Sequence, residues 1–216
     1  IGSASQWWLH HSLLSLRTGL VEQGTELILR SGETVATLTA LAAQTGATTV
    51  YCSRHYQPWS AQLETMLRGR LSDKGVELKR YPGTLLHEPE DVATGGGTPF
   101  KVFTPFWRAC NRRPDPRQPV PVPELTPYND SIESEELLDW GLLPTSPNWA
   151  FDWNDLWHPG EAGAQTALTQ FLDYHVQDYG DGRDIPAEPN TSKLSPYLRF
   201  GNLSPRQVWH AAQTSK

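Results

Sequence analysis

The chain has 216 residues and a formal net charge of −6, and its 17 glycines and 18 prolines together make up about 16% of it. That share lies below the roughly 25–30% that is typical of low-complexity disorder, so the composition predicts a folded chain. No apolar run approaches the roughly 18 residues that a membrane helix needs. Two cysteines without CxxC spacing, Cys52 and Cys110, exclude a disulfide framework or a zinc knuckle. We therefore expect a cytoplasmic, monomeric globular protein without a membrane segment.

The N-terminal residues predict an amphipathic helix followed by a buried strand. Leucines recur at steps of four, three and four from Leu9 to Leu20, which lines one helix face, and Gly24 is a plausible helix stop. Leu27 to Leu29 then form a short apolar run. This run predicts a buried strand.

The same unit is repeated twice. The second copy predicts an N-cap at Thr34, a stop at Gly46 and a strand over residues 48–51. The third has Pro58 near a helix start, Gly75 as stop and a strand over residues 76–78. Helices that alternate with short apolar strands are typical of a parallel sheet covered on both faces. The fold class predicted for residues 1–110 is therefore α/β, with a Rossmann-like parallel sheet.

Residues 111–158 have the composition of an interdomain linker. They contain eight prolines and almost no periodicity, although four tryptophans between residues 140 and 157 predict that the linker packs on the rest of the chain. Beyond Pro159 a helical stripe runs from Leu168 to Tyr179, with Gly180 as its predicted stop, and no strand signal follows. We predict that residues 159–216 begin a second, all-α domain.

Both ends of the sequence are abrupt. The chain opens on a helix where such a sheet normally begins with a strand. Its last helix is predicted to start with Ser204, Pro205 and Gln207 in capping-box order and to run to Lys216 without a stop. We expect a fragment that lacks the first strand and most of the second domain.

Common catalytic patterns are missing from the sequence. No pair of its seven histidines has metal-ligand spacing, so no metal site is predicted. Gly95 to Gly97 precede no lysine-serine pair of a phosphate-binding loop, and no GxSxG nucleophile elbow of a hydrolase occurs.

A candidate phosphate site lies near the C-terminus. Three hydroxyls, those of Thr191, Ser192 and Ser195, lie beside Lys193 ahead of Pro196, and hydroxyl donors with a cation at a helix start suit a phosphate. Ordinary helix caps at Ser195 and Ser204 explain the same residues.

Several motifs in the second half of the chain resemble the DNA photolyase and cryptochrome family. Arg183-Asp184-Ile185-Pro186, the run from Thr191 to Pro196 and the run from Gly201 to Arg206 follow the family's order. Phe100 to Phe106 is similar to its Tyr-Lys-Val-Phe-Thr-Pro-Phe element, and Trp7 to Leu13 resembles its first antenna-domain helix. The resemblance spans essentially the whole chain.

The resemblance implies FAD as the cofactor and damaged DNA as the partner. FAD contacts are implied for Tyr179 and for the run of Thr191, Ser192, Lys193, Leu194 and Ser195, while Arg183 matches a position that contacts DNA phosphate. Lys193 stands where most members have arginine. A lysine can pair with the pyrophosphate as a point charge, but it cannot donate the two parallel hydrogen bonds of a guanidinium. The antenna pigment stays open. Folate is not favoured, because Tyr56-Gln57-Pro58-Trp59-Ser60 replaces the family's Asn-Glu pair.

The function implied is that of a class I type deoxyribodipyrimidine photolyase, which repairs pyrimidine dimers with light and FAD. No catalytic residue is expected before Lys216, and the fragment alone should neither retain FAD nor repair DNA. Two alternatives remain: a cryptochrome-type flavin photoreceptor without repair activity, and a plain nucleotide-binding α/β module.

Overall fold

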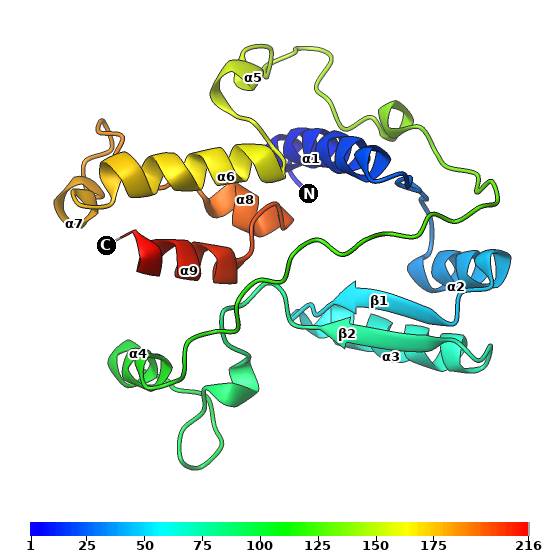
Figure 1. Cartoon of the computed structure of the whole chain (residues 1–216), viewed down its shortest axis with the longest axis horizontal. Coiled ribbons are helices and arrows are strands. Elements are labelled where there is room, and N and C mark those ends of the chain that lie inside the picture. Colours follow the sequence, from blue (N-terminus) through cyan, green and yellow to red (C-terminus); the bar gives the residue numbers. More distant parts are fainter. Residues whose placement is uncertain (216) are drawn as a thin grey trace.

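A computed structural model describes residues 1–215 of the chain (Figure 1). Its α-helices and strands, in chain order, are α1 (Ser3–Glu22), α2 (Thr34–Thr45), β1 (Thr49–Ser53), α3 (Pro58–Ser72), β2 (Glu77–Tyr81), α4 (Phe103–Asn111), α5 (Trp153–Leu156), α6 (Glu161–Gln170), α7 (Tyr179–Gly182), α8 (Ser195–Phe200) and α9 (Pro205–Thr214). Two 3₁₀ turns, η1 (Pro89–Asp91) and η2 (Leu137–Trp140), lie in the loops. A π-helical stretch, η3 (Phe171–His175), continues α6.

The predicted parallel sheet is present. β1 and β2 pair in parallel, with Thr49 opposite Glu77 and Ser53 opposite Tyr81. α3 connects the two strands and packs with α2 over an apolar cluster whose buried members are Val35, Ala42, Leu67, Leu71, Val76 and Leu78. The helix, glycine and strand pattern therefore predicted these four elements correctly, and the α/β fold class is confirmed.

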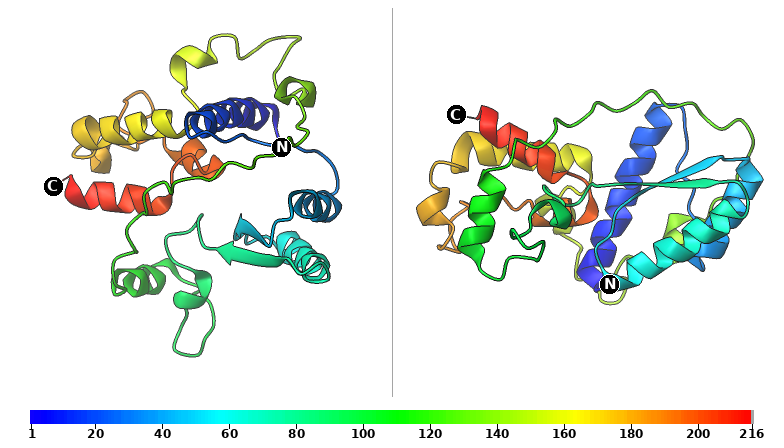
Figure 2. Two further views of the ribbon diagram at one scale, coloured as in Figure 1. Left: turned by 45° about the vertical axis from the view of Figure 1, so that its right-hand side comes forward. Right: turned by 90° about the horizontal axis from the view of Figure 1, so that it is seen from below.

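The second face of the sheet carries exposed side chains. Tyr51 and Tyr81 are 63% and 51% exposed, and their rings stack at 6.1 Å between centroids. The expectation of a sheet covered on both faces is therefore wrong for residues 1–215. Helix α1 does not supply the cover because it packs against α8. In Figure 2, α1 lies between the sheet with its two helices and the group of α6, α8 and α9.

The strand predicted at Leu27–Leu29 is also wrong. Leu29 is buried, but its backbone N–H donates to Ser134 Oγ and its carbonyl accepts from Glu135 N–H, both at 2.9 Å. Ser31 adds hydrogen bonds from its N–H and Oγ to the Glu135 carboxylate. An apolar run becomes a strand only when its backbone groups pair with another strand, and here the linker takes these groups.

The helix ends at α2 and α9 follow the sequence signals, with one shift of a single residue. Gly46 adopts φ +65° at the end of α2 as predicted, because this left-handed conformation favours glycine. At the start of α2 the N-cap is Glu33, whose carboxylate accepts from the N–H groups of Val35 and Ala36, so the prediction of Thr34 is off by one. The capping box of α9 is confirmed at Ser204 and Gln207. The predicted end at Lys216 lies outside the described residues.

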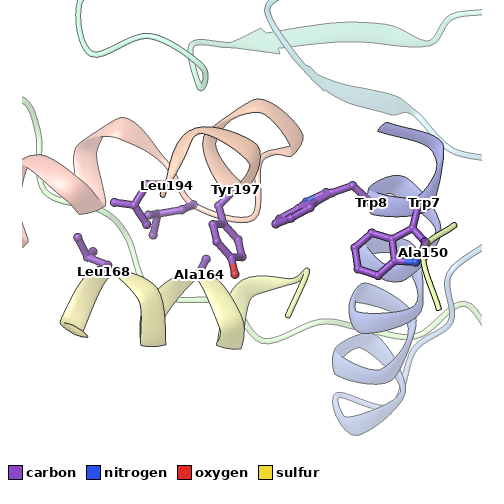
Figure 3. Packing of buried hydrophobic residues seen from close by; sticks show 8 residues of the cluster. Trp7, Trp8, Ala150, Ala164, Leu168, Leu194 and Tyr197 are labelled. Atoms are coloured by element: carbon purple, nitrogen blue, oxygen red, sulfur yellow. The ribbon is translucent and has the colours of Figure 1, made fainter. Parts of the chain in front are cut away.

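The larger apolar core joins α1 to the helical half of the chain. Its buried members are Trp7, Trp8, Ala150, Ala164, Leu168, Leu194, Tyr197 and Leu203, and Figure 3 shows Trp8 and Tyr197 side by side between α1 and α8. Trp153 and Trp157 from the linker pack against this cluster. The linker therefore packs on the chain, as its tryptophans predicted.

Further contacts hold the linker along its length. Tyr128 donates to the carbonyl of Gln44 at 3.4 Å, and His210 Nε2 lies 2.8 Å from the carbonyl oxygen of Pro116.

Within residues 1–215, no helix combines the length and the apolar character that crossing a membrane requires.

Candidate functional site

The first part of the candidate site is a turn of helix that presents Tyr179 and Arg183. Tyr179 opens α7, is 41% exposed and meets the ring of Phe171 edge to face at 5.8 Å. Gly180 was predicted to end the preceding helix, but it lies inside α7, so that stop is wrong. The guanidinium of Arg183 lies 6.0 Å from the centroid of the Tyr179 ring and its Nε lies 3.8 Å from Asp184 Oδ1. Aromatic surface and positive charge are thus presented side by side.

A close contact ties this turn to the hydroxyl-rich run that follows. A Cβ added at Gly182 would overlap the side chain of Asn190. Gly182 is buried, and Asn190 immediately precedes Thr191. The missing side chain at residue 182 therefore lets the turn with Tyr179 and Arg183 approach the run from Thr191 to Ser195.

The run itself has an exposed polar side and a buried anchor. Thr191, Lys193 and Ser195 are exposed, whereas Leu194 is 3% exposed and belongs to the core with Trp8. Ser192 Oγ accepts from the backbone N–H of Leu194 at 3.4 Å. Leu194 thus fixes the backbone while the hydroxyls and the amine point out of the core.

The cap predicted at Ser195 is not formed. α8 begins at Ser195 with Pro196 in its first turn, and the residue at the N-cap position is Leu194, which supplies no side-chain cap. Ser195 Oγ makes no hydrogen bond with the described residues. The hydroxyl is therefore free for a ligand, which removes the alternative that Ser195 is an ordinary helix cap.

Lys193 has an unusual backbone. Its φ of +51° is the only positive value at a non-glycine residue within residues 1–215. Such a conformation costs an L-residue roughly 1–2 kcal/mol, and strain of this kind often accompanies a binding site. With two exposed hydroxyls, the half-buried hydroxyl of Ser192 and one exposed ammonium, the run can bind a phosphate or pyrophosphate group.

One residue that positions this site was missed by the sequence analysis. Asn202 Oδ1 accepts hydrogen bonds from Trp8 Nε1 at 3.1 Å and from Ser12 Oγ at 3.2 Å. Gly201 ends α8 with φ +74°, which turns Asn202 back toward α1. The only signal in the sequence was the asparagine directly after a helix-ending glycine.

A second polar cluster lies at the carboxyl end of β1, where parallel sheets commonly bind ligands. Arg54 pairs with Glu88 at 2.6 Å and with Glu90, and Tyr56 donates to Glu88 at 2.6 Å. The hydrogen bond from Arg54 lowers the pKa of Glu90 to about 2. Burial and the bond to Glu88 raise the pKa of Tyr56 to about 12. These groups satisfy one another.

Two of the residues considered for folate, Trp59 and Ser60, differ in their surroundings. Trp59 is 60% exposed and Ser60 Oγ bonds to the carbonyl of Gln57 in its own helix turn. That the protein lacks a folate antenna pigment stays a prediction.

Within residues 1–215, no group of three His, Cys, Asp or Glu side chains is arranged to hold a metal ion.

The family follows from a comparison with known protein families. The family model described as DNA photolyase matches residues 1–124, which is more than half of the chain. The chain belongs to the DNA photolyase family. Membership agrees with the motifs around Thr191 and Gly201, which lie outside the matched range.

Individual relatives cover nearly all of this photolyase-family chain. A deoxyribodipyrimidine photo-lyase of Agrobacterium fabrum is 44% identical over 214 residues, which make up 99% of this chain and 45% of that protein. Cryptochrome-1 of Arabidopsis thaliana is 32% identical over 213 residues, or 97% of this chain and 31% of that protein. The chain thus spans less than half the length of these relatives.

Solved structures of photolyases and cryptochromes also match nearly the whole of this chain and about half of their own length. A bacterial class III photolyase from Agrobacterium tumefaciens matches with a TM-score of 0.93 and 44% identity over 97% of this chain and 44% of that one. A Synechocystis cryptochrome with a TM-score of 0.79 is 23% identical and supports the fold alone. The class I type expected from the sequence is not supported, because the 44% identical structure is described as class III. The domain boundaries and the site residues stay predictions.

Proposed function

We propose that the full-length protein is a light-driven, FAD-dependent photolyase of the class III type that repairs pyrimidine dimers in DNA. The observation that carries this proposal is the 44% identity to a photo-lyase across 99% of the chain, together with the exposed hydroxyl and amine groups of the run from Thr191 to Ser195. Bound FAD would supply light absorption and the electron that opens the dimer.

The residues of this chain fit one part of FAD, its pyrophosphate. Thr191, Ser192 and Ser195 would donate hydrogen bonds to phosphate oxygens, and Lys193 would neutralise negative charge. Tyr179 would contact the cofactor from the neighbouring turn. The described residues offer no second run of this kind for the rest of the cofactor. We therefore propose that the chain alone binds FAD too weakly to retain it.

Arg183 is proposed to contact the DNA backbone. Its side chain is 55% exposed and its partner, Asp184, is 80% exposed at 3.8 Å, so water screens the pair and its contribution to stability is small. The guanidinium can exchange Asp184 for a phosphate at little cost. Damaged DNA as the partner follows from the photo-lyase relatives and stays part of the proposal.

A flavin photoreceptor without repair activity is the second candidate. It is favoured by the 32% identity to Cryptochrome-1 over 97% of the chain. Both functions use FAD, so the residues of this chain support them equally.

Repair separates the two candidates. Full-length protein purified with FAD is mixed with an oligonucleotide that contains a thymine dimer, in light and in darkness, and intact thymines are counted by chromatography. A photolyase restores them only in light. Bound FAD that responds to light while all dimers persist contradicts repair and supports the photoreceptor.

A further inference from the structure

A pocket of about 430 Å³ lies between the N-terminal end of α1, α5 and α8. Four aromatic side chains line it: Trp8, Trp153, Trp157 and Phe200. Its volume falls in the range of about 300–1,000 Å³ that is common for small-molecule sites. Figure 3 shows that Trp8 extends from α1 toward α8.

The aromatic walls are held in place by contacts behind them. Trp8 donates through Nε1 to Asn202 and meets Trp157 edge to face at 5.5 Å. Trp153 meets Trp7 edge to face at 5.3 Å. A ligand would therefore meet rings that are already ordered, and binding loses little side-chain entropy.

The polar groups of the pocket all donate hydrogen bonds or carry positive charge. Ser195 and Arg199 lie four residues apart, on one face of α8, and Ser5 of α1 lines the same pocket. Arg199 is exposed and makes no ion pair or hydrogen bond with the described residues. None of the described residues that line the pocket is acidic. An aromatic pocket without carboxylates can attract cations, but Arg199 would repel one.

We propose that this pocket binds a mononucleotide, with its planar base against the tryptophan rings and its phosphate at Arg199. The guanidinium fork of Arg199, in a pocket that also holds the Ser5 hydroxyl, matches the oxygens of a phosphate, and a heteroaromatic base stacks on or meets the edges of aromatic rings. Trp8, Trp157 and Arg199 are outside the set of residues proposed to hold FAD; Ser195 lines the pocket but is assigned to FAD and is not needed here. The inference therefore does not rest on the proposed function.

The direct test is calorimetric titration with AMP and with adenosine of the full-length protein purified with its FAD bound and freed of unbound FAD. Bound FAD fills the flavin site and no free FAD competes for the pocket, so the titration reports a separate site. AMP should bind at least tenfold more tightly than adenosine, because only AMP carries the phosphate. Equal affinities, or no binding of AMP, overturn the proposal.

Three variants locate the site. Arg199→Gln should lower AMP affinity about tenfold and leave adenosine unchanged, and Ala4→Trp should block both ligands because Ala4 lines the pocket and is exposed. Arg70→Gln, which removes an exposed arginine on α3, should change neither affinity. Near-ultraviolet circular dichroism checks that each variant is folded. AMP affinity that is unchanged in folded Arg199→Gln or Ala4→Trp protein places AMP elsewhere and overturns the proposal.

Discussion

Trp8 and Asn202 are joined by a hydrogen bond of 3.1 Å from the indole Nε1 to the amide Oδ1, although 194 residues separate them in the sequence. The same amide oxygen accepts from Ser12 Oγ. Asn202 thus links α1 to the turn that ends α8, and through α8 to the run from Thr191 to Ser195. The run from Thr191 to Ser195 is therefore positioned by α1.

Replacing Asn202 should therefore destabilise the protein. Asn202→Ala leaves the N–H of Trp8 and the hydroxyl of Ser12 without their acceptor, and each unsatisfied buried group costs about 1–3 kcal/mol. Because two groups lose their acceptor, urea unfolding should show a loss of roughly 2 kcal/mol or more. Asn129→Ala at an exposed linker position is the control and should change the free energy of unfolding by less than about 0.5 kcal/mol. Equal stability of the two variants would contradict the role of Asn202.

Two glycines in α7 provide a matched pair for the site. Gly182→Ala should push Asn190 and the run behind it away from Tyr179, and FAD affinity should fall at least tenfold. Gly180→Ala meets no atom within 4 Å, so FAD affinity should be unchanged and the helix slightly more stable. The measurement is FAD titration by fluorescence on both full-length variants. The proposed contact is wrong if the two behave alike.

A comparison of local and long-range contacts shows how far the sequence could predict the structure. Helices and strands from Thr34 to Tyr81 follow from local periodicity and glycine positions, and the capping box at Ser204 is a local signal too. The apolar run at Leu27–Leu29 carries the same local signal as a strand, but its backbone bonds to residues 134 and 135, more than 100 positions away. No local pattern contains such a pairing, and the same is true of the bond between Trp8 and Asn202.

His10 should make stability depend on pH. It is 4% exposed, its Nδ1 has no hydrogen-bond partner among the described residues, and burial, helped by the charge of Arg17, lowers its pKa below the usual 6.5. The unfolded chain therefore binds a proton at a higher pH than the folded chain does. Stability is full above about pH 6.5 and falls as the pH drops below that value, by at most about 1.4 kcal/mol per pH unit.

Urea unfolding between pH 5 and 8 measures this dependence. His10→Leu should reduce the slope of the curve between pH 5 and 6.5, and part of the slope should remain because burial also lowers the pKa values of His11 and His87. His55→Leu at an exposed position should leave the curve unchanged. A parental slope that persists in His10→Leu protein would assign the pH dependence to other groups.

Arg183 should contribute one phosphate contact to DNA binding. In the full-length protein, Arg183→Ala should weaken binding to damaged and undamaged DNA about equally and reduce the slope of log affinity against log salt by about one. Fluorescence anisotropy at several salt concentrations gives both values. A loss confined to damaged DNA with an unchanged slope would assign Arg183 to the lesion instead of the backbone.

The most direct test of the account is FAD occupancy and light-driven repair measured together in full-length Lys193 variants. Lys193→Glu places a negative charge against the pyrophosphate, so both FAD occupancy and repair should be lost, whereas Lys193→Arg should retain or strengthen both. Lys193→Gly should fold at least as stably as the parent, because glycine adopts φ +51° without strain, yet bind FAD more weakly. Repair should rise in proportion to occupancy across the series. Parental FAD occupancy in the Lys193→Glu protein, or dimers left intact at full occupancy, would contradict the account.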